Sequence, residues 1–529
     1  MKTETQLKEK LSKSYLYLIL KDLIVILGIT ALMVLVFTTL LNREYITSAL
    51  ETSIIRKNTT FFIVSTIVGV VTLLVGHKLL KKINPQKLFF LLSVAFFIAG
   101  IYLVFNMPSK LNVADQLINY KIANQMNHGN FKSLLRHYTV VPGLKVGYLA
   151  IYPFQLGYVT YLRILEHFST NIRFFYFVNV MLMLGINYLL YLIVKLITKN
   201  NRLSLNWTML LSFLFLPELF FTLFVYGNIP GLMACLGAVY FGMKMIVEES
   251  QKVLSGSCCS LLFVLAYQLK SNYQIAVIAL GIVFVLHAIK SHNYWFITIP
   301  FMTFALMLGS NKLVTATYEA ESGYKVQKGL PMITYVAMGL QPHNTEGRGP
   351  GWYDDYTLNL YRSENLNSQK TAQAAKRKIK LELSYYVRNP KKARDFFINK
   401  FISTWADPTF QSVWLAPYSE RPRTRLLRNI YYSNYLPWNH HPQISWYQKS
   451  MKVIAAWCNF LVVTVLVLAM GFMFYQRKEL NPYAAFAVLY LIGGMMFHLV
   501  WETKSEYVFQ YFICLIPTAS MLLGEIRKK

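Results

Sequence analysis

The segment MPSKLNVADQLINYKIANQMNHGNFKSLLRHYTVVPGLKVGYLAIYPFQLGYVTYLR, residues 107–163, separates two strongly apolar parts of the chain. Its single acidic residue is Asp115, which comes soon after an apolar run long enough to cross a membrane. Asn, Gln, Tyr and His side chains accompany it. The cations nearest to it are Lys110, Lys121, Lys132, Arg136 and Lys145, and Arg163 ends the segment. We interpret the segment as a polar loop that lies at a membrane surface between spanning helices.

The composition indicates a protein that crosses the bilayer many times. The chain has 529 residues, of which 55% are hydrophobic and only 15% charged, and its mean hydropathy is +0.37. Several apolar runs approach the ~20 residues of a spanning helix, whereas a β-barrel would show ~10-residue alternating segments. The five cysteines lie in apolar runs and lack the spacing of a metal site or an external disulfide framework. We therefore expect an all-α polytopic membrane protein.

The formal net charge is +29, an excess that nucleic-acid-binding proteins also show. No nucleic-acid motif accompanies it, and the cations are dispersed among the apolar segments. We attribute the charge to the positive-inside bias and to solvated loops, and we expect no nucleic-acid partner.

The apolar runs and the basic links between them predict about 12 spans with both termini in the cytoplasm. The first run has no small-residue cleavage site, so we expect an anchor. The segment 147–167 is more polar, and placing it against the membrane puts every short basic link on one side. The predicted spans are 22–42, 61–80, 87–106, 172–197, 206–226, 229–247, 256–271, 273–289, 294–310, 451–475, 482–501 and 507–524.

These spans divide the chain into three parts. Residues 1–310 form an N-terminal transmembrane module with a catalytic external loop at 107–171, residues 311–450 an extracytoplasmic segment, and residues 451–529 the last transmembrane helices. Between Lys312 and Lys449 the external segment has 20 Lys/Arg against 10 Asp/Glu. The spacing of Ala372, Ala375, Ile379, Leu383 and Tyr386 predicts a helix there. Asn389-Pro390 predicts an N-cap and first residue of the next helix.

Asp115 is the main candidate for chemistry. On a helix it would border an apolar line together with Asn119, and a carboxylate there could accept the proton of an attacking hydroxyl. The alternative is an exposed aspartate favoured by the helix dipole.

Cations that could neutralise a phosphate include Arg136, Arg163 and Lys270. Lys270 lies between two apolar runs, where a cation either lines a cavity or reaches to the interface.

Other residues allow both a structural and a functional interpretation. Glu218 lies within a predicted span, and Glu502 and Glu506 flank a turn that also contains Lys504. Trp352 belongs to the glycine-rich stretch GRGPGWYDDY, which is either a surface loop or a sugar-stacking loop. The chain has no HxxxH, HExxH, phosphate-cradling GxxxxGK or dinucleotide-binding glycine pattern. We therefore expect neither a fixed metal site nor nucleotide-driven chemistry.

Several motifs, in order, resemble those of GT-C glycosyltransferases, in particular the family-39-like membrane enzymes of Gram-positive bacteria. These are similar to protein O-mannosyltransferases and to the lipid A aminoarabinose transferase. The matching stretches are Asp115 in the first large external loop, YPFQLG, YGNIP, LKSNYQIAVIA, PMITYVAMGLQ with GWY, and WETKSEYVFQYF. They extend from about residue 107 to 515.

The resemblance implies a polyprenyl-phosphate-linked sugar as donor and Asp115 as the general base. It implies no cofactor, although a divalent cation could assist the leaving phosphate. The expected donor contacts are Lys270, Arg163, Arg136, Gln155 and Tyr152. The expected acceptor or sugar contacts are Asn119, His137, Asn228, Trp352, Glu502 and Tyr507.

From these observations we expect an inverting glycosyltransferase in the cell membrane with an extracytoplasmic active site. The basic external segment suggests an anionic cell-wall or teichoic-acid-like glycopolymer as acceptor, with a lipid or protein as alternatives. Two other functions stay open: a flippase or transporter of lipid-linked glycans, and a polymerase or ligase that uses a diphosphate-linked donor. The absence of an inverted repeat argues against transport.

Overall fold

The computed structural model describes residues 2–46, 52–111, 115–136, 147–248, 252–342, 347–417, 420–431, 445–476 and 479–525. Almost all of its regular structure is helical, and the described strands are the antiparallel pair β1 (Asn42–Ile46) and β2 (Ser53–Lys57). The first half contains α1 (Lys2–Leu41), α2 (Thr60–Leu80), α3 (Pro85–Asn106), α4 (Asp115–Asn127), η1 (Lys132–Leu134), α5 (Tyr148–Ile151), η2 (Pro153–Gln155), α6 (Leu156–Glu166), α7 (Ile172–Ile197), α8 (Arg202–Phe213), α9 (Leu216–Phe221) and α10 (Asn228–Val247). The second half contains α11 (Lys252–Leu269), η3 (Ser271–Tyr273), α12 (Gln274–Ser291), α13 (Trp295–Ser322), α14 (Ile333–Gly339), α15 (Tyr356–Ser363), α16 (Ser368–Arg388), α17 (Pro390–Trp405), α18 (Arg425–Ile430), α19 (Ser445–Tyr475), α20 (Pro482–Val500), η5 (Ser505–Tyr507) and α21 (Phe509–Glu525).

Within the described ranges, nine helices are long and apolar enough to cross a membrane, which makes the chain an all-α polytopic membrane protein. They lie in α1, α3, α7, α10, α11, η3 with α12, α13, α19 and α20. The predicted count of about 12 is not confirmed. The predicted span 206–226 is interrupted, since α8 ends at Phe213 and α9 covers only Leu216–Phe221. The apolar stretch of α2 (Thr60–Val71) and the 17-residue α21 are shorter than the nine.

The short basic links between helices meet at one end of the bundle, which we call the link end (residues 81–84, 198–201, 290–293 and 479–481). The Nδ2 of Asn206 donates to the carbonyls of Leu80 (2.7 Å) and Ile83 (3.0 Å). Lys290 Nζ donates to Glu479 Oε1 at 2.7 Å, which joins two further links. Three of these links end in asparagines, Asn84, Asn201 and Asn481, that cap the helices α3, α8 and α20. The links that the sequence predicts to be cytoplasmic therefore lie together, while their side of the membrane stays a prediction.

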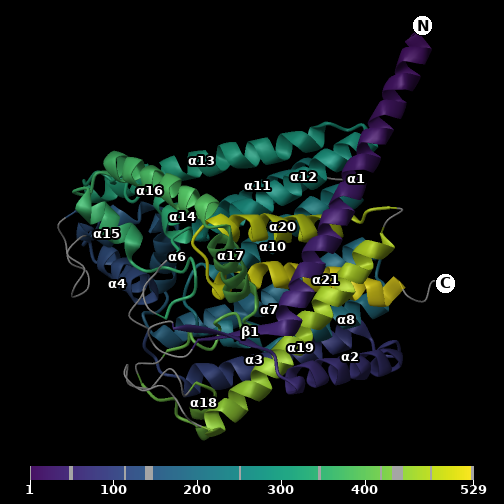
Figure 1. Cartoon of the computed structure of the whole chain (residues 1–529), viewed down its shortest axis with the longest axis horizontal. Helices are drawn as coiled ribbons and strands as arrows, with labels where there is room; N and C mark the ends of the chain where they lie inside the picture. The colour runs from purple at the N-terminus through teal and green to yellow at the C-terminus, as the bar shows by residue number, and fades with distance from the viewer. Residues whose placement is uncertain are drawn as a thin grey trace.

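The opposite end, which we call the loop end, gathers segments that are distant in the sequence. The backbone N–H of Arg423 donates to Asn106 O (2.9 Å), and Tyr176 OH donates to Lys110 O (3.3 Å). Because α3 ends and α7 begins there, the segment 107–171 leaves and re-enters the bundle at the same end. Its longest helix after Pro153 is α6, whose 11 residues measure about 16 Å, too short to cross a bilayer. Figure 1 shows α4, α6, α14, α15 and α16 together on the left, with both termini on the right.

The segment between α13 and α19 is helical where it is described. The helix predicted from the Ala372–Tyr386 spacing is α16, and α17 begins at Pro390 as predicted. Asn389 precedes α17 but does not cap it with its side chain; its Nδ2 instead donates to Tyr385 O of α16 (3.0 Å). The buried face of α17 also includes a cation, Lys400, which the sequence did not single out.

Candidate functional site

Asp115 is the first residue of α4. The position of this helix is set by the residues that it buries against the rest of the protein. Ile122, Ala123 and Met126 are buried on that face. Gln116, also buried, accepts a hydrogen bond from the backbone N–H of Val225 (3.1 Å). This bond ties the start of α4 to the turn between α9 and α10.

Two tyrosine hydroxyls donate to the two oxygens of the Asp115 carboxylate. Tyr148, the first residue of α5, lies 2.9 Å from Oδ1, and Tyr226, in the turn before α10, lies 3.4 Å from Oδ2. Burial raises the pKa of both hydroxyls, so they stay protonated and can only donate to the carboxylate.

Asp115 is an exposed residue, although nearby protein desolvates its carboxylate. Desolvation by this protein raises its pKa. The bond from Tyr148, the charge of Lys504, the bond from Tyr226 and the charge of Lys270 oppose that rise. The result is an accessible carboxylate with a raised pKa and fixed orientation, which are properties of a general base.

The YPFQLG stretch forms the bend between α5 and α6 and supplies two expected residues. Gln155, which is buried, donates to Tyr226 OH at 2.5 Å and so orients that hydroxyl toward Asp115. The ring of Tyr152 packs against Tyr148 with centroids 4.9 Å apart, and its hydroxyl shares a hydrogen bond with Tyr353. Asn119 lies one turn after Asp115, where its Nδ2 donates to Asp115 O (2.8 Å).

Lys270 occupies the break between α11 and η3, outside both flanking spans. Its Nζ donates to Asn228 Oδ1 (2.6 Å) and lies 5.2 Å and 4.9 Å from the ring centroids of Tyr226 and Tyr507. Desolvation lowers the pKa of Lys270 to about 8, against the opposing charges of Glu506, Glu502 and Asp115. The amine therefore carries its charge at neutral pH and can lose it just above.

The link from Trp501 to Tyr507, between α20 and η5, brings further charges to this place. Tyr507 OH donates to Glu502 Oε1 (3.2 Å), and Glu502, Lys504 and Glu506 all act on the charge of Lys270. We call Asp115, Tyr148, Tyr226, Lys270, Asn228, Glu502, Lys504, Glu506 and Tyr507 the loop-end cluster. The cluster thus contains two lysines, three carboxylates, three tyrosines and one asparagine.

Residues 400–411 support the back of this link with a continuous row of hydrogen bonds. Lys400 Nζ donates to Gly339 O (2.5 Å) and Trp501 O (2.8 Å), and Thr404 Oγ1 pairs with Thr503 Oγ1 (3.0 Å). Ser505 donates to Asp407 (3.0 Å), and the N–H of Glu506 donates to Gln411 Oε1 (3.1 Å). The link is therefore held at Trp501, Thr503, Ser505 and Glu506.

The structure places several expected residues elsewhere. Arg163 bonds to Glu321 (2.8 and 2.5 Å) and to Asn127 Oδ1 (3.0 Å), which commits its guanidinium to an ion pair on α6 and α13. Trp352 is fully buried and donates to Ser403 Oγ (3.2 Å), so its indole is a packing group and not an exposed sugar platform. Arg136 is exposed at the end of the described part of its loop, and His137 lies outside the described residues.

Glu218 is separate from the loop-end cluster. It lies in α9, within the interrupted span, fully buried, where Asn187 Nδ2 donates to its Oε2 (2.6 Å) and its Oε1 has no hydrogen-bond partner. A buried acid within a membrane span is a candidate functional residue, here separate from the loop-end cluster.

Sequence reasoning missed Tyr148, Lys400 and the role of Lys504, and named Tyr226 only as part of a turn. The chain contains 36 tyrosines, so residue type gave no signal for Tyr148. For Lys400 a signal existed: Phe396, Ser403 and Thr404 lie three to four residues away and share its face.

No set of three His, Cys, Asp or Glu side chains in the described ranges could hold a metal ion. No protein-family model and no curated protein matches the chain. The resemblance to GT-C glycosyltransferases therefore stays a prediction from the motifs.

Proposed function

We propose that the protein is an inverting glycosyltransferase that moves a sugar from a polyprenyl-phosphate carrier to an acceptor hydroxyl, with Asp115 as general base. The observation that carries the proposal is the Asp115 carboxylate. It is accessible, is oriented by two tyrosine hydroxyls and lies within the electrostatic influence of two lysines. It lies at the end of a bundle of spanning helices, where a lipid-linked substrate would present its head group.

The reaction needs one base and one stabilised leaving group. The acceptor oxygen attacks the anomeric carbon from the face opposite the phosphate and forms the new glycosidic bond. The bond between that carbon and the phosphate oxygen breaks, and its electron pair leaves with polyprenyl phosphate. The proton of the acceptor hydroxyl passes to Asp115. Charge that develops on the leaving phosphate is stabilised by nearby cations.

Lys270 and Lys504 are the cations we assign to that phosphate. Lys270 is held by Asn228 and by two aromatic faces, none of which neutralises its charge. Arg163 is not assigned to the phosphate, because Glu321 already pairs with it. The basic segment between α13 and α19 favours an anionic acceptor such as a cell-wall glycopolymer.

The test is transfer from a radiolabelled polyprenyl-phosphate sugar by purified protein, with release of free polyprenyl phosphate as the second product. Asp115→Asn is expected to reduce transfer by about 10²- to 10⁴-fold, the usual contribution of a positioned base. Asp395→Asn is the matched control, since Asp395 is exposed on α17 beside Arg394. Full activity of the Asp115→Asn protein, with unchanged melting behaviour, would refute the assignment.

One observation favours the transport alternative: the interrupted α8–α9 span with the buried Glu218. A flippase would move a lipid-linked glycan across vesicle membranes without releasing polyprenyl phosphate. It would depend on Glu218 and not on Asp115. A polymerase or ligase would require a diphosphate-linked donor in the same assay.

A further inference from the structure

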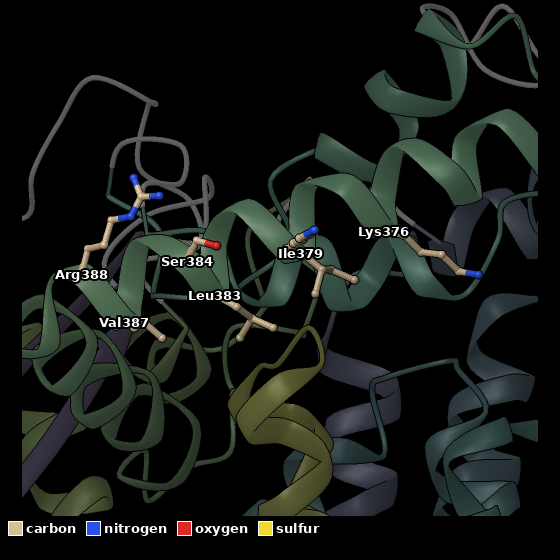
Figure 2. A pocket seen from close by; sticks show the side chains of 7 residues that line it. Lys376, Ile379, Leu383, Ser384, Val387 and Arg388 are labelled. Atoms are coloured by element: carbon tan, nitrogen blue, oxygen red, sulfur yellow. The ribbon is translucent and has the colours of Figure 1, made fainter.

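One face of α16 is apolar, and its exposure increases from the half-buried Ile379 to Val387. Ile379, Leu383 and Val387 follow each other at intervals of four residues, so they form a line along the helix. Leu383 is 49% and Val387 82% exposed. Figure 2 shows their side chains along one edge of α16. Exposed apolar side chains in a row have a free-energy cost in water, so this line needs an explanation.

Cations flank the apolar line. Lys376, Lys380 and Arg388 line the same shallow groove. The whole helix has six Lys or Arg residues and one acid, Glu382. Glu382 is buried and pairs with Lys378, so it does not neutralise the cations of the groove.

The adjoining buried face fixes the orientation of the helix. Thr371, Ala375 and Tyr386 are buried, and Tyr386 OH donates to Leu340 O at the end of α14 (2.9 Å). At the N-terminal end Ser368 Oγ donates to Gly329 O (2.6 Å). The groove therefore faces outward because the adjoining face of α16 is bound at both ends.

This groove is connected to the point where a spanning helix reaches the loop end. Tyr335 of α14, which packs under α16, stacks on Trp501 directly after α20. The last turns of α20 expose Met496 (69%) and Val500 (44%), which are the apolar side chains expected to face lipid.

We propose that this face of α16 lies in the membrane interface and binds the head groups of anionic phospholipids. The apolar line would enter the boundary between head groups and acyl chains, while Lys376, Lys380 and Arg388 contact phosphate groups. Charge complementarity alone would also suit a soluble polyanion. The apolar line favours lipid, because a polyanion gains nothing from contact with Leu383 and Val387. The inference does not depend on the glycosyltransferase activity.

The test uses the full chain in detergent, labelled with an environment-sensitive fluorophore at Val387→Cys and titrated with short-chain phosphatidylglycerol or phosphatidylcholine. Phosphatidylglycerol is expected to blue-shift the emission at concentrations at least about tenfold lower than phosphatidylcholine. Replacing Lys376, Lys380 and Arg388 by Gln should remove most of that difference. The matched control replaces Lys370, Arg377 and Lys391, which are also exposed but do not line the groove.

A second variant, Ile379→Ser with Leu383→Ser, separates lipid from polyanion. It should weaken the response to phosphatidylglycerol and leave any response to polyphosphate unchanged. Three results would overturn the proposal: an equal response to both lipids, an equal loss in the matched control, or a response to polyphosphate but not to phosphatidylglycerol.

Discussion

The surroundings of Lys270 and Lys400 differ in one respect that separates function from support. Both amines are desolvated, and the charge of Glu502 acts on both. Lys400 is completely buried and donates to two backbone carbonyls, Gly339 O and Trp501 O. Lys270 is half-buried and donates to one side chain, Asn228, with two aromatic rings as its other neighbours.

The two lysines therefore differ in how many hydrogen-bond donors they keep for a ligand. An ammonium group has three donors, and those of Lys400 point at carbonyls that join α14 to the link after α20. The fit is tight: a Cβ at Gly351 would lie 2.6 Å from Lys400 Cε, and Gly351 has a φ of +75° that favours glycine. Lys270 keeps donors for an anion. We therefore expect Lys270 to serve the substrate and Lys400 to serve the fold.

Of the two lysines, Lys270 should have the larger effect on transfer, and Lys270→Met tests it. Removing the charge next to the leaving phosphate should lower kcat by about 10²- to 10³-fold, the scale measured when one stabilising donor is removed. Because Lys270 has few partners in the protein, the apparent melting temperature should change little. Steady-state kinetics and a thermal shift assay on the same preparation check both parts. If Lys270→Met lowered the melting temperature without changing kcat, Lys270 would support the fold and would not serve the substrate.

Lys400→Met should show the opposite pattern. The carbonyls of Gly339 and Trp501 would lose their donor, at a cost of about 1–3 kcal/mol for each buried unpaired group. Removal of a desolvated amine offsets part of this cost, so we expect a net loss of about 2–4 kcal/mol. Thermal unfolding in detergent measures the loss, with Lys391→Met, exposed on the same helix, as control. A variant that melts like the wild type would show that Lys400 does not support the link.

The pH dependence of transfer should sharpen the assignment of Lys270. Its pKa is lowered to about 8 by desolvation, so the charge is present below that pH and lost above it. Transfer should therefore fall by up to about tenfold per pH unit above 8. Toward acid pH, the loss of transfer should begin at a higher pH than for an ordinary aspartate, since desolvation raises the pKa of Asp115. Lys270→Arg, whose charge persists at high pH, should lose the alkaline limb. If the wild type and Lys270→Arg lost activity at the same alkaline pH, the group that titrates there would not be Lys270.

The sequence predicted the class of fold and most of the cluster, because both depend on strong local signals. Apolar runs of spanning length mark the membrane helices, and Asp115 is conspicuous as the single acid of its loop. The interruption at 214–215 was missed because that run is as apolar as its neighbours. Lys400 was missed because it resembles the other cations of a basic segment, and the only local signal was the set of uncharged residues on its face of the helix. The ion pair of Arg163 was not predicted because its partner, Glu321, lies 158 residues away in sequence.

Arg163 allows the smallest and most specific test, since it is a third cation with a known partner. Its guanidinium forms an ion pair with Glu321 and lies over the rings of Phe131 and Tyr318. The pair is partly exposed, with 17% and 40% of the two side chains accessible, so its loss should cost about 1 kcal/mol or less. Arg163→Gln should therefore lower the melting temperature slightly and leave transfer within about threefold of the wild type. Glu321→Gln should give the same small loss of stability, because each variant removes the same pair. If Arg163→Gln instead reduced kcat as much as Lys270→Met, while Glu321→Gln did not, the phosphate would be bound by Arg163 as well. The loop-end cluster would then extend along α6, and a cation already paired in the protein could no longer be taken as unavailable to substrate.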